Sequence, residues 1–183
     1  MRRILYAILG FFEHYQALKR VRRIQSIDDL TPEFFYSSNI KVLVLDFDGV
    51  LSAHGEPEPN SFARSWLSKQ LEESKLEKIF ILTNNPQVER ERFFEAHFPQ
   101  ILFVSSGRKK PYPDGLLSVI EKNQVLPQEV ALIDDRLLTG MLAAQKAGVK
   151  GFWVTHPFMN FRKCPIKEMG FFLLRWLEKI LIF

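Results

Sequence analysis

Two aspartates separated by one residue, Asp46 and Asp48, follow directly on the aliphatic run of residues 42–45 and precede Gly49. Four consecutive aliphatic residues are typical of a strand that is buried on both faces of a parallel sheet. Ligands of such sheets bind beyond the carboxyl ends of the strands, so the two carboxylates would face a ligand. Paired carboxylates can supply a nucleophile and a proton carrier, although Asp-x-Asp-Gly can also be a simple turn.

Polar side chains also stand at three other predicted boundaries of strands and helices. Thr83 and Asn84 end a second apolar run, Lys110 precedes a helix, and Asp134 and Asp135 end a later apolar run. Each alone has an ordinary explanation, as a turn residue, a solvated charge or a helix cap. Together they would place a hydroxyl, an amide, an ammonium and a second carboxylate pair at the edge of the sheet that holds the first pair. This joint arrangement is hard to explain by chance, and it predicts an active site.

The segments that carry these groups alternate between strand and helix patterns. Apolar runs predict strands at residues 42–45, 79–82, 101–104, 130–133 and 152–154. Helical patterns lie between them, at residues 61–75, 87–98, 114–123 and 137–147. Repeated strand and helix units predict an α/β fold with a three-layer, Rossmann-like, doubly wound parallel sheet. No internal repeat or linker divides residues 26–183, which we expect to form one domain.

The composition narrows the range of partners. The 183 residues include 25 Lys or Arg and 21 Asp or Glu, which gives a net charge of +4. This mild excess fits an anionic substrate or a membrane surface, and no basic block or aromatic recognition motif predicts a nucleic-acid partner. The single cysteine, Cys164, excludes an intramolecular disulfide, and the four histidines lack the spacing of zinc ligands. Neither a P-loop nor a dinucleotide glycine fingerprint is present.

Residues 1–25 predict a separate amphipathic helix. Ile4, Ile8, Phe11, Tyr15 and Leu18 recur at helical spacing, with Arg and Lys gathered at both ends. The apolar run is too short to span a bilayer, and no small-residue cleavage site follows it. Two interpretations stay open, a helix that lies in a membrane interface and a helix that packs on the domain.

The last segment, residues 170–183, predicts an apolar helix in which only Arg175, Glu178 and Lys179 are polar after residue 170. Such a helix must be covered, and the sheet, a partner chain or lipid could cover it. Two apolar ends on a domain of ordinary composition favour a peripheral position on a membrane, on its cytoplasmic side. The single cysteine fits a reducing compartment.

The order of the polar groups resembles the signature of the haloacid dehalogenase superfamily of phosphotransferases, over nearly the whole chain. The resemblance implies that Asp46 is the nucleophile that takes the phosphoryl group as an aspartyl phosphate. Asp48 would protonate the leaving oxygen and then activate water. Thr83 and Asn84 would bind the phosphate, and Lys110 would offset the negative charge of the nucleophile and the phosphoryl group.

Within the superfamily, the chain is most similar to the phosphatidylglycerophosphate phosphatase branch of bacteria and mitochondria. The likeness rests on five short stretches, residues 26–30, 110–113, 135–139, 144–148 and 153–157. It implies a phosphorylated lipid, phosphatidylglycerophosphate, as substrate in phospholipid biosynthesis. In a eukaryote the expected location would be the matrix side of the mitochondrial inner membrane.

The spacing of the motifs adds to this expectation. Only 34 residues separate Asp48 from Thr83, and 26 separate Thr83 from Lys110. By resemblance, members that enclose small metabolites insert a cap domain in one of these gaps, and neither gap has room for a large one. We therefore expect an open site, which suits a large or surface-held substrate.

The resemblance also implies a Mg²⁺ site. Its ligands would be the Asp46 carboxylate, the Asp48 backbone carbonyl and an aspartate of the last motif, all oxygen ligands that suit this hard cation. Asp135 is the expected ligand in that motif. Gly140 stands where the phosphatidylglycerophosphate branch usually has another aspartate, and Asp134, where that branch usually has Gly, is the reserve ligand.

Two other functions stay open. The chain could be a capless phosphatase of sugar phosphates or other small soluble metabolites. Because of Gly140, it could also be an impaired enzyme that binds a phosphorylated ligand on the same fold. A receiver domain is disfavoured, because its acidic pair comes first and its Lys last, whereas here Lys110 precedes Asp134.

Overall fold

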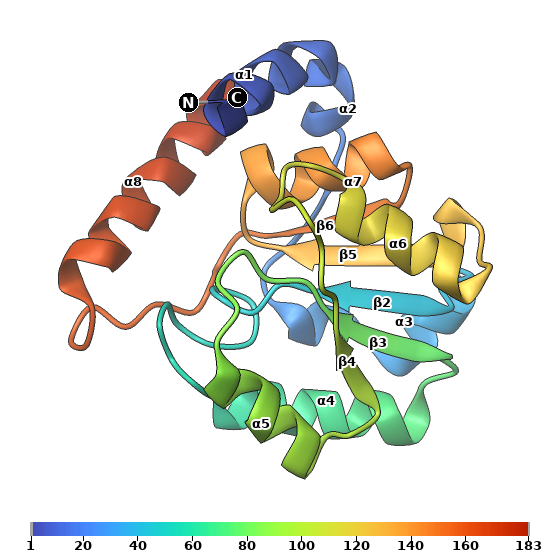
Figure 1. The fold of residues 1–183 in the computed structure, drawn as a ribbon. Helices are drawn as coiled ribbons and strands as arrows, with labels where there is room; N and C mark the ends of the chain where they lie inside the picture. Colours follow the sequence, from blue (N-terminus) through green and yellow to red (C-terminus); the bar gives the residue numbers. More distant parts are fainter. Residues whose placement is uncertain (1, 183) are drawn as a thin grey trace.

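A parallel sheet runs through the centre of the molecule (Figure 1). Across residues 2–182, which the computed structural model describes, the strand order is β1-β6-β5-β2-β3-β4. The strands are β1 (Arg22–Ile24), β2 (Val42–Leu45), β3 (Lys78–Ile81), β4 (Ile101–Phe103), β5 (Val130–Asp134) and β6 (Lys150–Val154). All neighbouring strands in this order pair in parallel. The predicted doubly wound α/β fold is therefore confirmed.

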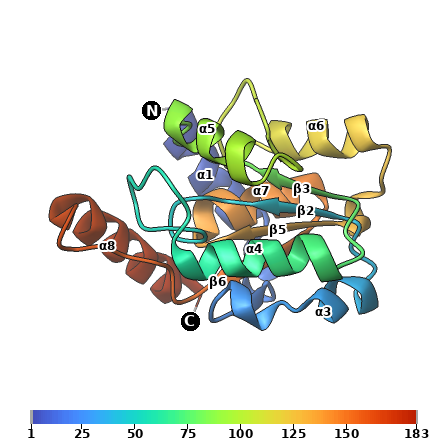
Figure 2. The ribbon, with the colours of Figure 1, turned by 90° about the horizontal axis from the view of Figure 1, so that it is seen from below.

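Helices cover both faces of the sheet and complete the three layers (Figures 1 and 2). One face packs against α3 (Pro32–Ser37), α4 (Ser61–Glu73) and α5 (Val88–His97). The other face packs against α1 (Arg2–Glu13), α2 (Tyr15–Lys19), α6 (Asp114–Asn123) and α7 (Leu142–Ala147). Short 3-10 turns, η1 (Ile27–Asp29) and η2 (Pro127–Glu129), precede α3 and β5.

The central strand β2 positions the first carboxylate of the site. Leu43 and Leu45 pack in the core on one side of the sheet, and Val42 and Val44 pack in the core on the other. Alternate side chains of a strand point to opposite faces, so a strand covered on both faces needs apolar residues throughout. The first polar residue is Asp46, at the carboxyl edge, where the chain leaves the sheet. The aliphatic run therefore fixes the position of this carboxylate.

Some elements differ from the sequence-based expectation. Residues 22–24 of the N-terminal segment form the edge strand β1, which pairs with β6, and the short helix α3 was not predicted. Two exposed arginines and one buried isoleucine lack the alternation by which a strand is recognised. The helix predicted at residues 137–147 consists of a π-helical turn, η3 (Leu137–Met141), followed by α7.

The N-terminal helix α1 packs on the domain with few buried residues. Gly10 and Phe11 are its buried residues. A Cβ atom at Gly10 would lie 2.9 Å from the Cε atom of Lys146 and 3.0 Å from a methyl carbon of Leu142, so the glycine lets α1 approach α7 closely. The opposite face of α1 is exposed and apolar, which leaves the interfacial interpretation of that face open.

The last helix, α8 (Pro165–Ile182), crosses the carboxyl edge of the sheet, outside both helix layers (Figures 1 and 2). It begins before the predicted segment, at a proline, which is tolerated in the first turn because the N–H groups there have no partner in the helix. Phe183 lies outside the described residues. Among residues 2–182, no helix is both long enough and apolar enough to cross a bilayer.

Candidate active site

The predicted nucleophile, Asp46, lies at the end of β2 beside a buried lysine. Its carboxylate accepts a hydrogen bond of 2.8 Å from the backbone N–H of Phe47. The Nζ atom of Lys110 lies 3.1 Å from Oδ1 of Asp46 and donates to Oδ2 of Asp134 at 2.5 Å. Burial by itself would lower the pKa of Lys110, but Asp134 and Asp46 outweigh it and raise that pKa. Lys110 is therefore a permanent cation shared by two carboxylates.

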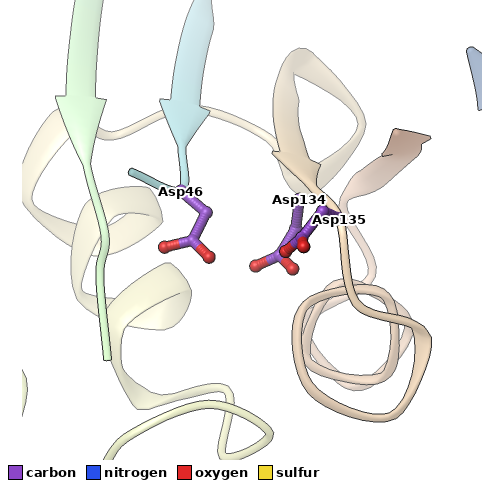
Figure 3. A group of neighbouring side chains, drawn as sticks. All are labelled: Asp46, Asp134 and Asp135. Atoms are coloured by element: carbon purple, nitrogen blue, oxygen red, sulfur yellow. The ribbon is translucent and has the colours of Figure 1, made fainter. Parts of the chain in front are cut away.

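Three carboxylates converge at this edge of the sheet. Oxygen atoms of Asp46, Asp134 and Asp135 all lie within 4.8 Å of one another. Figure 3 shows the carboxylate of Asp46 and those of Asp134 and Asp135 facing each other across the space between β2 and β5. Burial raises the pKa of Asp46 to about 8, although Lys110 opposes the shift, and burial raises the pKa of Asp135 to about 7. A divalent cation that prefers oxygen ligands fits this set of donors and would supply the positive charge that three buried carboxylates need.

The side chain of Asp134 lies directly against Gly140. A Cβ atom at Gly140 would lie 2.0 Å from Cγ of Asp134 and 2.2 Å from its Oδ2 atom. The carboxylate of Asp134 therefore fills the space that any side chain at residue 140 would need. The backbone N–H of Arg136 donates to Asp134 Oδ1 at 2.9 Å and holds the group there. The two departures from the motif expected by resemblance, an added aspartate and a missing one, thus lie next to each other in the structure.

Asp135 is held by an arginine from the C-terminal helix. Nε of Arg175 donates to Oδ2 of Asp135 at 2.6 Å, and the two residues form a buried ion pair. Gly49 leaves room for this pair, because a Cβ atom there would lie 2.5 Å from Oδ2 of Asp135. The backbone at Gly49 also has φ of +84°, which disfavours other residues. One carboxylate oxygen of Asp135, Oδ2, is thus occupied by Arg175.

Asp48 is fixed by a different arginine. Arg90, on α5, donates to Oδ1 of Asp48 at 2.7 Å and to Oδ2 at 3.1 Å. Arg90 has no exposed surface, and its guanidinium lies over the ring of Phe47. The N–H of Gly55 adds a third hydrogen bond to Asp48, at 3.2 Å. These three hydrogen bonds hold the carboxylate of Asp48 in one orientation.

A cavity of ≈310 Å³ opens beside these groups. It is lined by five residues predicted from the sequence, namely Asp46, Asp48, Thr83, Asn84 and Asp135. The remaining two, Lys110 and Asp134, are buried and form the wall behind Asp46. The Asn84 side chain donates to the carbonyl of Lys110 at 3.2 Å, and the Thr83 hydroxyl accepts from the N–H of Asn85 at 3.1 Å. The structure thus brings the sequence-predicted residues to one place.

Several charged residues of the site did not emerge from the sequence. Two of them, Arg90 and Arg175, hold Asp48 and Asp135. Two others line the cavity, Arg3 of α1 and Arg136, which follows the second aspartate pair. Arg136 pairs with Glu178 of α8 at 2.8 Å. Its place next to Asp135 is a signal that could have been used, whereas nothing in the local sequence distinguishes Arg90 from its neighbours. The cations Arg3 and Arg136 beside the carboxylates make the cavity suitable for an anion.

Part of the chain matches the sequence model of a known protein family. Residues 64–154 match the sequence model of a family described as haloacid dehalogenase-like hydrolase. The matched segment includes Thr83, Lys110 and both Asp134 and Asp135. No curated protein sequence matches the chain significantly.

Two solved structures share the fold. An uncharacterized protein from Listeria monocytogenes serotype 4b aligns with a TM-score of 0.52 and 14% identity, over 69% of this chain and 85% of that one. A haloacid dehalogenase-like family hydrolase from Streptococcus pneumoniae aligns with a TM-score of 0.51 and 12% identity, over 73% of this chain and 99% of that one. At these identities the likeness concerns the fold alone, and it does not single out the phosphatidylglycerophosphate branch.

Proposed function

We propose that the chain is a haloacid dehalogenase-like hydrolase that cleaves phosphomonoesters with the help of a divalent cation. Residues 64–154 match the sequence model of that family, and the fold agrees with this assignment. The observation that carries the proposal is the convergence of Asp46, Asp134 and Asp135 within 4.8 Å of one another. Next to them lies a cavity lined by Thr83 and by two arginines. Such a site combines a nucleophile with groups that bind a phosphate.

The reaction would proceed in two displacements. In the first, a carboxylate oxygen of Asp46 attacks phosphorus, the bond from phosphorus to the ester oxygen breaks, and Asp48 gives the leaving oxygen a proton. In the second, Asp48 takes a proton from water, the water oxygen attacks phosphorus, and the bond to Asp46 breaks. Inorganic phosphate leaves and Asp46 is restored. Arg90 keeps Asp48 in position for both proton transfers.

The cation is proposed to be Mg²⁺. Asp46, Asp135 and Asp134 would hold it with their side chains, and the backbone carbonyl of Asp48 would contribute by resemblance. Bound there, Mg²⁺ would neutralise charge on the phosphoryl oxygens and on the carboxylates. We propose that Asp134 takes the place of the carboxylate expected at residue 140, an exchange of position that supports a working site over an impaired binding protein.

Phosphatidylglycerophosphate is the leading substrate in this proposal. The sequence motifs carry the resemblance to that branch, and the segment from Asp48 to Thr83 contains a loop, α4 and β3 without a cap domain. A lipid phosphate would be met at the cytoplasmic, or mitochondrial matrix, surface of a membrane. The alternative is a small soluble phosphomonoester such as a sugar phosphate, which the cavity of ≈310 Å³ could also hold.

Phosphate release from several substrates separates these possibilities. Phosphatidylglycerophosphate in mixed micelles and a panel of soluble phosphomonoesters are assayed with Mg²⁺ and with a chelator. We expect the lipid to be preferred, and we expect activity to disappear with the chelator and in Asp46→Asn. Turnover of soluble esters alone would overturn the lipid assignment, and no turnover of either class would overturn the phosphatase assignment.

A further inference from the structure

Three of the charged residues of α8 face the protein. Glu168, Arg175 and Glu178 are the buried charges of the helix. Glu168 accepts hydrogen bonds of 3.1 Å from the backbone N–H groups of His54 and Asn160. Arg175 pairs with Asp135, and Glu178 accepts from the backbone N–H of Leu137 at 2.9 Å. Because these contacts fix one side of the helix against the domain, the other side must point away from it.

The side of α8 that points away is apolar. We call it the α8 outer face. Its residues are large, hydrophobic and exposed: Ile166, Met169, Phe172, Leu173, Leu174, Trp176, Leu177, Ile180 and Leu181. At 3.6 residues per turn they cover an arc of about 200°. A water-facing helix normally shows the reverse pattern, so this surface is expected to meet an apolar environment.

Two lysines border the α8 outer face. On the helical arc, Lys167 lies just beyond Leu174 and Lys179 lies just before Phe172, so there is one lysine on each side. The Nζ atom of Lys179 donates to the carbonyl of Thr155 at 3.4 Å. Both acidic residues of α8, Glu168 and Glu178, are turned inward. Long cationic side chains at the borders of an apolar face can extend to lipid headgroups. The charge on this surface is therefore positive only.

Helix α1 repeats the pattern. Its exposed apolar residues, Ile4, Leu5, Ile8, Leu9 and Phe12, form the α1 outer face. Arg2 and Arg3 precede that face, and Glu13, which pairs with Lys146, follows it. Arg3 of α1 and Phe171 of α8 both line the cavity that contains Asp46, so each helix reaches the mouth of the site.

We propose that the α8 and α1 outer faces dock on the surface of an anionic phospholipid bilayer and hold the site at that surface. Exposed apolar arcs bordered by cations complement anionic headgroups, whereas two like-charged copies of these faces would repel each other. A second, mainly apolar cavity of ≈240 Å³ lies under α8, between Trp153, Phe172 and Trp176. The docking surface stands on its own, while delivery of a lipid phosphate to the cavity at Asp46 rests on the proposed function.

Flotation of the full chain with vesicles tests the docking surface without any reaction. The vesicles consist of phosphatidylcholine alone or mixed with phosphatidylserine, neither of which is a phosphomonoester. We expect the wild type and Asp46→Asn to float with the anionic vesicles. The affinity of the double variant Leu173→Gln with Leu177→Gln for these vesicles should fall at least about tenfold, because two half-exposed leucines no longer enter the membrane.

A matched control removes leucines of similar exposure elsewhere, with Leu117→Gln and Leu126→Gln, and it should bind like the wild type. Turnover of a soluble phosphomonoester by the Leu173 and Leu177 variant should stay unchanged, which separates this test from failure of the proposed function. Absence of wild-type flotation, or unchanged flotation of the double variant, would overturn the proposal. A wild-type dimer by light scattering, without vesicle binding and lost in the double variant, would assign the faces to a second copy instead.

Discussion

The carboxylate of Asp134 occupies the space above Gly140 that a side chain at residue 140 would need, with only 2.0 Å between Cγ of Asp134 and a Cβ atom placed on the glycine. A small residue at one position and a carboxylate at the other therefore depend on each other. The acidic group at this edge of the sheet therefore comes from Asp134.

This relationship predicts the behaviour of reciprocal variants. Gly140→Asp alone should destabilise the protein by about 1–3 kcal/mol or more, because the new side chain collides with Asp134. Asp134→Gly alone should weaken Mg²⁺ binding about 10- to 100-fold, since a buried carboxylate beside Lys110 is lost. The double variant should recover most of both losses. Thermal unfolding and Mg²⁺ titration of the activity measure these effects, and a double variant no better than Asp134→Gly would refute the exchange.

The ion pair of Arg175 with Asp135 predicts a stability that depends on the metal. Arg175→Met leaves a buried carboxylate without its partner, which should cost about 3–5 kcal/mol in the presence of a chelator. The loss should be smaller at saturating Mg²⁺, because the cation compensates the same carboxylate. Urea unfolding with and without Mg²⁺ measures the difference, and Lys167→Met, at an exposed lysine of α8, is the control. Equal losses in both conditions would show that Asp135 does not contact the cation.

The raised pKa values predict that metal binding releases protons. Burial raises the pKa of Asp46 to about 8 and that of Asp135 to about 7, so at neutral pH the metal-free site holds protons that a cation must displace. The apparent affinity for Mg²⁺ should therefore rise as the pH increases from about 6 to about 8. Calorimetry in two buffers of different ionisation enthalpy should give different binding enthalpies. Identical enthalpies would mean that no proton leaves.

The hydrogen bonds from Arg90 to Asp48 predict that a change at Arg90 slows turnover. Arg90→Lys keeps the charge but cannot donate to both carboxylate oxygens in the same geometry, so Asp48 loses its fixed position. We expect kcat to fall about 100-fold with little change in KM, because a misplaced proton carrier affects the chemical steps. Arg92→Lys, at an exposed arginine of the same helix, is the control. A change confined to KM would assign Arg90 to substrate binding.

The fold and the centre of the site could be predicted because their signals are local. The buried run before Asp46 and the apolar runs before Thr83 and Asp134 mark strands whose carboxyl ends meet at one edge. The carboxyl ends of neighbouring parallel strands lie side by side, so the polar residues that follow these strands come close together. The strand order itself was not needed to bring these residues to one edge.

The remaining features depend on contacts between distant segments. Arg90 and Arg175 reach Asp48 and Asp135 across 42 and 40 residues of sequence, and neither arginine belongs to a local motif. The orientation of α8 also could not be predicted, because a helix with few charges gives no sign that those charges face inward. The edge strand β1 is too short, and its arginines too exposed, for a pattern to reveal it.

Detection of a phosphoryl group on Asp46 is the most direct test that this residue is the nucleophile of a phosphatase. The protein is mixed with Mg²⁺ and a phosphomonoester that it hydrolyses, quenched in acid, and digested for mass spectrometry. We expect a hydroxylamine-sensitive phosphoryl group on the peptide that contains Asp46, and we expect Asp46→Asn to lack it and to release no phosphate. Phosphate release by Asp46→Asn at the wild-type rate, or a phosphoryl group on another residue, would contradict it.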